Sequence, residues 1–320
     1  MKYSGIGGQA VIEGIMMKNG DKYAVAVRKP DKDIDVKTDT YVSLGRRYAL
    51  LRLPLIRGVI SFAESMYLGL KTLMYSASFY EDEDEGEPSR FERALERIFG
   101  DKLDKVILTF SMVLAFVMAL IIFMWLPLFL AGIVRPFIGN ETLLSLIEGI
   151  IRVLIFILYI KLVSRTEDIK RTFMYHGAEH KCINCIEHGL PLTVENVAIS
   201  SKQHKRCGTS FIFLVMIISI LFFMVIRVDS IGLRLLSRII LVPVIAGVSY
   251  EVLMAAGKHD NIFMDIISKP GLMMQELTTK EPDKDMIEVA IAAVEAVFDW
   301  KKYEADNFPE NVRKPKDEPV

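Results

Sequence analysis

Four of the five histidines and all three cysteines of this chain lie within residues 173–210. The densest part of this stretch is His176-Gly177-Ala178-Glu179-His180. On an α-helix, where successive residues turn by about 100°, the two histidines and Glu179 fall within about a third of the circumference. Their side chains can therefore converge on one object, and a metal ion is a candidate for that object.

A second pair of candidate ligands, His204 and Cys207, stands just before a long apolar segment. Zinc favours imidazole nitrogen and thiolate sulfur in a tetrahedral array. We therefore predict a divalent metal site, with zinc as the metal, whose ligands are His176, His180, His204 and Cys207. Glu179 would then be the general base that polarises a bound water, as the glutamate of His-x-x-Glu-His does in inverted zinc peptidases.

The predicted ligand set contains an internal difficulty. Four protein ligands close a tetrahedral zinc, which suits a structural site, whereas a catalytic site keeps one position open. Either one of the four residues is not a ligand, or the site is structural. In the alternative without metal, these polar residues hydrogen-bond lipid headgroups, backbone ends and one another at the membrane surface.

The remaining histidines and cysteines have simpler explanations. Cys182 and Cys185 are i,i+3 neighbours on the predicted helix, so we interpret them as packing residues or supplementary ligands. His188 stands at the predicted helix end, where a cation suits the carbonyl terminus. His259, beside Asp260, is an outlying candidate ligand.

A serine or cysteine hydrolase has less support. Cys207 has His204 three residues away as a base, but the chain contains no Gly-x-Ser-x-Gly elbow. Activation of such a nucleophile needs a geometry that spacing alone does not display.

The central motif needs a helix to hold it, and local signals predict one over about 165–188. Ser164-Arg165-Thr166-Glu167 has the form of a capping box, in which the serine and glutamate side chains bind first-turn amides. Gly189 followed by Pro191 supplies a stop signal.

Composition predicts a membrane protein. Of the 320 residues, 52% are hydrophobic, and the mean hydropathy is +0.32, which is too apolar for an ordinary soluble enzyme. The net charge of -1 and the absence of an RNA-binding signature give no reason to expect nucleic acid. The lipid bilayer is therefore the first predicted partner.

Four apolar segments are long enough to cross about 30 Å of hydrocarbon. They are residues 106–134, 143–163, 211–228 and 231–256. Pro127 predicts a kink or an end in the first segment, and Glu148 and Arg152 form an i,i+4 pair in the second. We interpret this pair as a structural ion pair that fixes helix packing, with a polar pathway as the alternative.

The distribution of basic residues predicts the orientation. The loop 135–142 contains one basic residue, whereas residues 161–206 contain eight. By the positive-inside rule, the N-terminus, the His/Cys stretch and the C-terminus face the cytoplasm, in a multi-pass protein of the cell membrane.

Residues 50–80 form a further helical candidate, beginning near Pro54. Arg57, Glu64 and Lys71 recur every seven residues on it. Three central charges at about 2.5 to 3.5 kcal/mol each outweigh a dozen apolar residues at roughly 0.3 to 0.6 kcal/mol each. We therefore predict that this helix lies in the membrane interface or against the bundle and does not span.

The predicted fold class is a mainly α membrane protein with four transmembrane helices and a small N-terminal β-rich module. Residues 9–13, 23–28 and 34–38 predict a three-stranded antiparallel sheet. The C-terminal region predicts a short turn at 270–275 and a helix from Pro282 to about Trp300, after which the chain frays.

These patterns divide the chain into seven parts. They are a β-rich cytosolic module (1–48), an amphipathic interfacial helix (49–80), an acidic linker with a short helix (81–105), transmembrane hairpin 1 (106–163), the cytosolic His/Cys loop (164–210), transmembrane hairpin 2 (211–256) and a cytosolic C-terminal helix and tail (257–320).

Five segments together resemble the YqhQ-like bacterial membrane proteins, a family of unknown function. The segments run from Gly7 to Met17, Pro54 to Gly58, His176 to Lys181, Arg206 to Phe211 and Leu277 to Pro282. The resemblance implies metal-dependent enzyme chemistry at the five residues named above as ligands and base. It does not require cysteine at positions 182 and 185, and Lys205 stands where the family pattern has proline.

Two functions from different classes follow. The first is a metal-dependent hydrolase that acts on a membrane-associated substrate from the cytosolic side. The alternative is a non-enzymatic scaffold or assembly factor that binds another membrane protein complex, such as insertion or envelope machinery.

Overall fold

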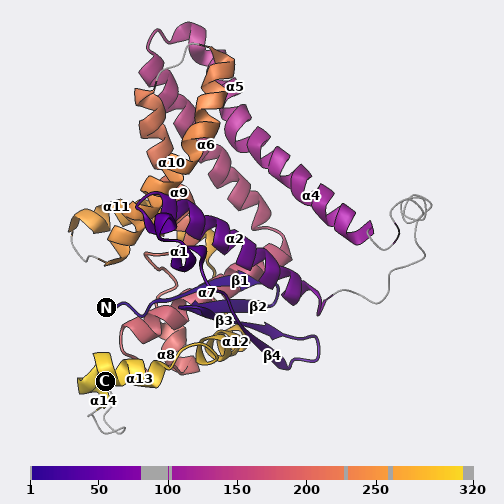
Figure 1. Cartoon of the computed structure of the whole chain (residues 1–320), viewed down its shortest axis with the longest axis vertical. Helices are drawn as coiled ribbons and strands as arrows, with labels where there is room; N and C mark the ends of the chain where they lie inside the picture. The colour runs from indigo at the N-terminus through magenta and orange to yellow at the C-terminus, as the bar shows by residue number, and fades with distance from the viewer. Residues whose placement is uncertain (1, 81–99, 101–102, 227–229, 259–261, 313–320) are drawn as a thin grey trace. The chain divides into compact units, whose positions relative to one another are not determined.

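The N-terminal strands form one antiparallel sheet in the computed structural model of the chain (Figure 1). The structure describes residues 2–80, 100, 103–226, 230–258 and 262–312. The strands are β1 Ile6–Val11, β2 Gly14–Asn19, β3 Lys22–Arg28 and β4 Ile34–Thr40, in the order β1-β2-β3-β4. The module therefore has four strands, and the prediction of three was wrong.

The strand missed by the prediction is β2, because the turn before it gives no ordinary sequence signal. Only Ile12 and Glu13 connect β1 to β2, and Glu13 adopts a left-handed conformation with φ 47°. Turns of this kind normally contain glycine, asparagine or aspartate. Residues 9–13 consequently resembled one strand, although the strand ends at Val11 and the turn follows.

The helices follow the sheet in the chain. Those with described bounds are α1 Leu44–Arg47, η1 Ala49–Arg52, α2 Ile56–Ala77, α4 Leu103–Leu120, η3 Ile121–Trp125, α5 Leu126–Val134, η4 Arg135–Phe137, α6 Glu141–Val163, α7 Glu167–Glu187, α8 Val194–Ile199, α9 Gly208–Val225, α10 Ile231–Lys258, α11 Ile262–Thr278, α12 Lys284–Glu295, α13 Trp300–Asn307 and α14 Pro309–Val312. The chain divides into two compact units, one of residues 1–80, 160–219 and 228–320, the other of 81–159 and 220–227.

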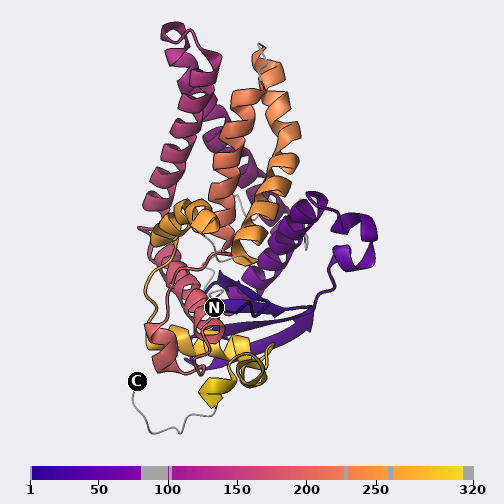
Figure 2. The same ribbon diagram turned by 90° about the vertical axis from the view of Figure 1, so that its left-hand side faces the viewer.

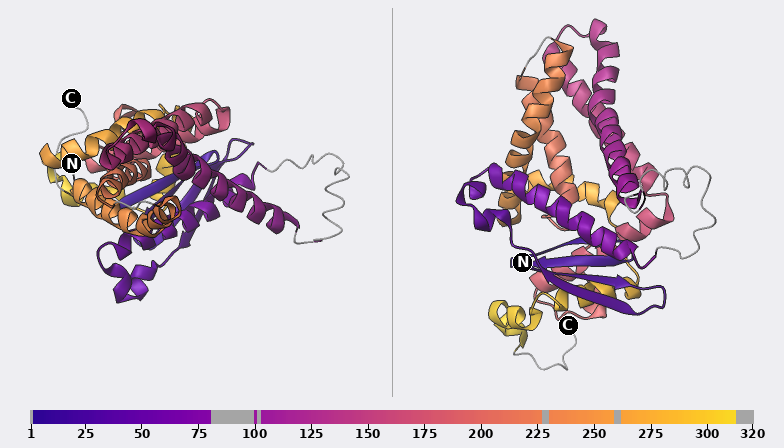
Figure 3. Two further views of the ribbon diagram at one scale, coloured as in Figure 1. Left: turned by 90° about the horizontal axis from the view of Figure 1, so that it is seen from above. Right: turned by 45° about the vertical axis from the view of Figure 1, so that its right-hand side comes forward.

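Helices cover both faces of the sheet within the first unit (Figures 1 and 2). Ile15 and Met17 point to one face and share a hydrophobic core with α7 and α12. Met16 and Val25 point to the other face, where Leu68 of α2 completes a second core. Alternate residues of a strand face opposite sides, so the consecutive buried residues 14–17 of β2 and 23–27 of β3 hold α2 and α7 on opposite faces of one sheet (Figure 3).

Helix α2 begins at Ile56, two residues after the predicted start near Pro54. Leu55 directly before it has a φ of 71°, and residues 49–52 form the separate turn η1. The predicted charged stripe exists, and its side chains bind other groups of this chain. Arg57 forms an ion pair with Glu251 of α10, and Glu64 accepts a hydrogen bond from the Ser43 hydroxyl. The stripe therefore fastens α2 to other parts of its own unit.

Helix α7 matches the predicted helix to within two residues at each end. The predicted capping box is wrong, because Thr166 is the N-cap and makes no capping bond through its side chain, while the Ser164 hydroxyl donates to Lys161. The predicted stop is confirmed: Gly189 has a φ of 73° and its N–H donates to the Ile186 carbonyl.

Four helices among the described residues are long and apolar enough to cross a membrane. They are Thr109–Phe137, Glu141–Val163, Gly208–Val225 and Leu235–Gly257, which match the four predicted segments. The coarse fold prediction, a mainly helical chain with four such helices and an N-terminal sheet, is therefore confirmed.

The ion pair of α6, the second of these apolar helices, has a structural explanation within the second unit. Arg152 donates to Glu148, and both side chains are almost fully buried. Its Nε also donates to the Phe123 carbonyl at 3.1 Å. Pro127, four residues after Phe123, has no N–H for the α-helical bond to that carbonyl, and Arg152 donates to it.

The C-terminal region is more regular than predicted. Residues 270–275 belong to α11, which continues through Pro270. The C-terminal helix α12 ends at Glu295, before Trp300, and the predicted frayed tail begins with α13. The acidic run at 81–88 lies outside the described residues.

Gly14 supplies a test of the packing within the sheet. A Cβ atom there would lie 2.3 Å from the Ala26 carbonyl oxygen of β3, whereas one at Gly7 would meet nothing within 4 Å. We expect Gly14→Ala to lower the free energy of unfolding by about 2 kcal/mol and Gly7→Ala to leave it unchanged. Thermal unfolding of both variants in detergent micelles measures the difference, and equal melting temperatures would contradict this packing.

Candidate metal centre

Helix α7 carries the central motif on its buried side. His180 and Glu179 are 1% and 5% exposed. The ring centroids of His176 and His180, one turn apart, lie 4.4 Å from each other. The helical spacing that the sequence predicted therefore brings both imidazoles together.

Cys207 joins this pair from a different part of the chain, directly before α9. Its Sγ lies 3.2 Å from His176 Nε2. One possible ligand atom from each of His176, His180 and Cys207 falls within a group whose members all lie within 4.8 Å of one another. Among the described residues, these three alone form such a group of histidine, cysteine or carboxylate side chains.

Backbone carbonyls orient the two imidazoles. Nδ1 of His176 lies 2.9 Å from the Thr278 carbonyl oxygen, and Nδ1 of His180 lies 2.7 Å from that of Lys202. A carbonyl only accepts, so each Nδ1 carries a proton, and Nε2 is the ring nitrogen that can bind a metal once it carries none. Histidine ligands of metals are ordinarily oriented by this kind of second hydrogen bond.

Gly177 allows the Thr278 segment to approach α7. A Cβ at this position would lie 2.0 Å from the Lys280 carbonyl oxygen. The Lys280 N–H in turn donates to the Phe173 carbonyl at 2.9 Å. The glycine inside the motif therefore has a packing role that sets the position of the carbonyl bound by His176.

Electrostatics favour a thiolate beside an imidazolium at this site. Burial alone would raise the pKa of the Cys207 thiol, but His176 and His180 hold that pKa well below its usual range. Burial opposes protonation of His176, yet the Cys207 thiolate outweighs it and raises the pKa of His176 to about 9. Cys207 is therefore in the form that binds metals.

Glu179 lies between the imidazoles and the edge strand of the sheet. Its carboxyl carbon would be 2.9 Å from a Cβ at Gly8, and the nearby Gly8 N–H acts to lower its pKa. Burial raises the pKa of Glu179, although His176 and His180 act against this rise. Its Oε2 is buried with no hydrogen-bond partner among the described residues. A buried carboxylate oxygen in this state is unusual and suggests that a further group binds here.

His204 stands beside this group but belongs to a different network. Its ring centroid is 5.8 Å from that of His180, and its Nε2 lies 3.4 Å from Glu187 Oε2. Gln275 accepts the His204 N–H and donates to its carbonyl, which fixes the backbone. Of the four predicted ligands, the structure brings three together and holds His204 against a carboxylate.

Three of the other four histidine and cysteine residues lie in the described part of the chain. Cys182 and Cys185 are buried in the core between α7 and α12 as free thiols, in agreement with a packing role. His188 Nδ1 binds the Asn184 carbonyl at the end of α7. His259 lies outside the described residues.

A cavity of about 500 Å³ opens beside the three donors. Glu179 and the donor group contribute to its lining, as do residues 6–10 of β1. Its apolar lining includes Phe62 and Met66 of α2, Phe211 and Ile212 of α9 and Leu253 of α10. The site therefore faces a space that is lined by both polar and apolar side chains.

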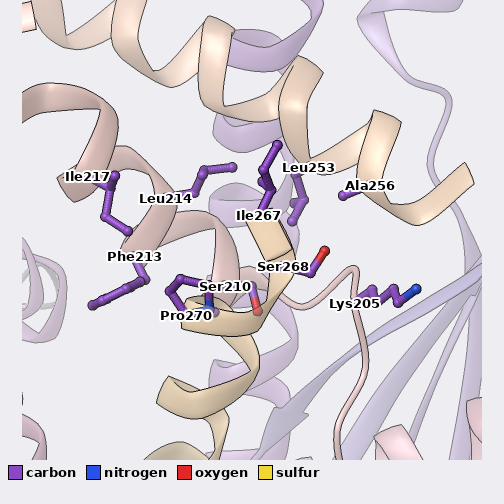
Figure 4. Close-up of a pocket in the computed structure, with 11 residues that line it drawn as sticks. Lys205, Ser210, Phe213, Leu214, Ile217, Leu253, Ala256, Ile267, Ser268 and Pro270 are labelled. Carbon is purple, nitrogen blue, oxygen red and sulfur yellow. The ribbon is translucent and has the colours of Figure 1, made fainter. Parts of the chain in front are cut away.

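Several residues of the site were not predicted from the sequence. Gly8, Thr278 and Gln275 act through backbone or amide contacts across the fold. Gly8 and Thr278 lie within segments that carry the family resemblance, and this was the only signal that could have found them. A second hollow, among α9, α10 and α11, holds only about 20 Å³ and is too small for a substrate (Figure 4).

Comparisons with known proteins agree with the resemblance. The model of a family described as protein of unknown function (DUF1385) matches residues 53–300. The uncharacterized protein YqhQ of Bacillus subtilis (strain 168) is 36% identical over 291 residues, which cover 89% of each chain. No solved structure matches. Neither description mentions a metal or an activity, so the metal chemistry that the resemblance implies gains no support from these matches.

The buried Glu187 gives a pH-dependent prediction. Burial would raise its pKa, but its contacts with His204 and Arg206 lower it to about 2. A depressed pKa contributes stability that is present above the unfolded value near 4.5 and is lost as the pH falls through about 2. We expect Glu187→Gln to cost roughly 2 to 3 kcal/mol at pH 7 and progressively less between these two pH values.

Thermal unfolding of wild type and Glu187→Gln across this pH range measures the effect. The exposed Glu195 is the matched control, and Glu195→Gln should leave the melting temperature unchanged. A pH-independent difference for Glu187→Gln would show that the carboxylate charge does not stabilise the fold.

Proposed function

This chain belongs to the DUF1385 family, whose activity is unknown, and we propose that it is a metal-dependent hydrolase acting on a membrane-associated substrate. The observation that carries the proposal is the convergence of His176, His180 and Cys207 within 4.8 Å beside a buried, unpaired oxygen of Glu179. Two parts of the chain supply these groups, so the convergence is a property of the fold and not of a short motif.

The donor set fits a divalent metal, and zinc best. Two imidazole nitrogens and one thiolate are typical zinc ligands, and His₂Cys or Cys₂His sets with a fourth, open position occur in catalytic sites. The carbonyls of Thr278 and Lys202 already fix the imidazole tautomers that such a site needs. His204, bound to Glu187, is not required as a ligand, which removes the difficulty of a closed four-ligand site.

A bound divalent metal would supply a polarised carbonyl and a water of lowered pKa. The chain's own residues do the rest. Glu179, whose pKa is raised by burial, would accept a proton from the attacking water at Oε2 and pass it to the leaving group. Gly8 would hold the other side of this carboxylate by donating its N–H.

The cavity supports a membrane-associated substrate. Phe211 and Ile212 belong to α9 and Leu253 to α10, two of the four helices apolar enough to span a bilayer. An apolar substrate could reach the donor group along these helices without crossing water. The bilayer is thus the proposed partner, and nucleic acid is not.

A cysteine nucleophile is a second candidate, favoured by one observation. Cys207 contacts His176 at 3.2 Å, and the Thr278 carbonyl orients that imidazole. This is the relation of nucleophile, base and orienting group. The base would be His176, and not His204 as the spacing suggested. The scaffold alternative stays a prediction without a specific observation in its favour.

Metal content tests the proposal directly. The full chain purified in detergent should contain about one zinc per chain by mass spectrometry. His180→Ala and Cys207→Ser should lose it, while Glu179→Gln and His204→Ala should keep it, because neither is a proposed ligand. His188→Ala is the matched histidine control.

Zero occupancy in the wild type after loading with zinc would overturn the proposal. Rapid alkylation of Cys207 that depends on His176 would then favour the cysteine nucleophile. Loss of zinc in His204→Ala would instead indicate four ligands and a structural site.

We also propose that the N-terminus, the metal centre and the C-terminus lie in the cytoplasm, from the excess of basic residues in 161–206. Alkaline phosphatase, which is active only outside the cytoplasm, should be active when fused at Gly139 and inactive when fused after Asn307. Green fluorescent protein at the same positions should give the opposite pattern. A reversed result at both positions would contradict this orientation.

A further inference from the structure

Strand β1 is an edge of the sheet and also a wall of the cavity. It pairs with β2 on one side only, and its residues 6–10 line the cavity next to Glu179. An edge strand presents backbone N–H and C=O groups that another extended chain can pair with. Here that edge borders the space in front of the proposed metal centre.

The register shows which groups of β1 point away from β2. The two-residue turn makes Val11 and Gly14 a hydrogen-bonded pair, so the alternate residues Ile6, Gly8 and Ala10 direct their backbone groups outward. Two observations agree with this assignment: the Ile6 N–H donates to the Ser4 hydroxyl, and the Gly8 N–H lies near the Glu179 carboxylate and acts to lower its pKa. The carbonyls of Gly8 and Ala10 and the Ala10 N–H also point outward.

The cavity beside this edge is also lined by apolar side chains. Residues 6–10 of β1 share the lining with Phe62, Met66 and Phe211, which suit apolar side chains of a ligand. Gly7 adds no side chain to the lining, and a Cβ there would meet nothing within 4 Å. The space thus offers both backbone hydrogen bonds and apolar contacts.

We propose that the substrate is a polypeptide in extended conformation, which adds to the sheet as a further strand beside β1. One of its residues would exchange both backbone hydrogen bonds with Ala10, and the N–H two residues along would donate to the Gly8 carbonyl. The chain would then pass directly beside Glu179, which lies near the Gly8 N–H. This inference rests on the proposed hydrolase function and names its substrate class.

The reaction is hydrolysis of a peptide bond, which needs no oxidant or further reactant. Water adds to the amide carbonyl carbon, the C–N bond breaks, and the products are a carboxylate and an amine. The proton taken from water by Glu179 goes to the departing nitrogen. Polypeptides carry apolar side chains and regularly spaced backbone N–H groups, which match the apolar lining and the strand edge of the cavity.

The first test uses dye-labelled β-casein, an unfolded polypeptide, with the zinc-loaded full chain in detergent. We expect cleavage that is lost in Glu179→Gln, and mass spectrometry locates the cleaved bonds. A peptide spanning one such bond is then synthesised with N-methyl groups on alternate residues, in both possible registers. Strand pairing predicts that one register lowers binding to Glu179→Gln about tenfold or more, while the other leaves it nearly unchanged.

A variant tests the same contact from the protein side. Ala10→Pro removes an N–H that points away from β2, so the β1–β2 ladder is kept, whereas Ala10→Gly retains the N–H. We expect Ala10→Pro to weaken peptide binding about tenfold with unchanged zinc content, and Ala10→Gly to bind normally. The peptide registers decide the question if Ala10→Pro does not fold.

The outcomes separate this inference from the proposed function. Zinc-loaded protein that leaves casein intact but hydrolyses lipid in phosphatidylethanolamine–phosphatidylglycerol vesicles would overturn the polypeptide substrate and keep the hydrolase. Equal binding of both N-methylated registers would overturn pairing with β1. Absence of zinc would overturn the proposed function itself, and this inference with it.

Discussion

The contact between His176 and Cys207 is the constraint on which the candidate site depends. It joins the middle of α7 to the start of α9, at 3.2 Å between Nε2 and Sγ. The close approach of the Lys280 segment at Gly177 and the Thr278 carbonyl hold the imidazole from behind. These groups are fixed by backbone contacts, so the site is preorganised rather than assembled by a ligand.

The sheet gives this constraint its support. Its two middle strands are buried on both faces, which fixes α7 on one side and α2 on the other. Gly8 of the edge strand then meets Glu179 without an intervening side chain. One small sheet thus positions the general base that we propose and borders the cavity into which that base faces.

Patterns within one element were predictable from the sequence. The helical spacing of His176 and His180, the stop at Gly189 and the four apolar helices are local or compositional, so the sequence alone indicates them. The contact with Cys207 was predicted as a meeting of two segments, because few other residues could complete a ligand set. In the same way, the opposite charges of Glu148 and Arg152, four residues apart in an apolar segment, predicted a buried ion pair.

Features that depend on tertiary contacts were not predictable. Strand β2 follows a turn closed by Glu13 in a left-handed conformation, which only the surrounding sheet can impose. The pairing of His204 with Glu187, instead of with the other donors, arises where the end of α7 meets the segment before α9. Spacing along the chain cannot distinguish these two partners for one imidazole.

The central claim is that three protein ligands hold a metal with one position open. X-ray absorption at the zinc edge of the loaded full chain measures the first coordination shell. We expect one sulfur at about 2.3 Å, two imidazole nitrogens and one further light atom from water. A shell without sulfur, or one with three imidazoles and a sulfur, would contradict it.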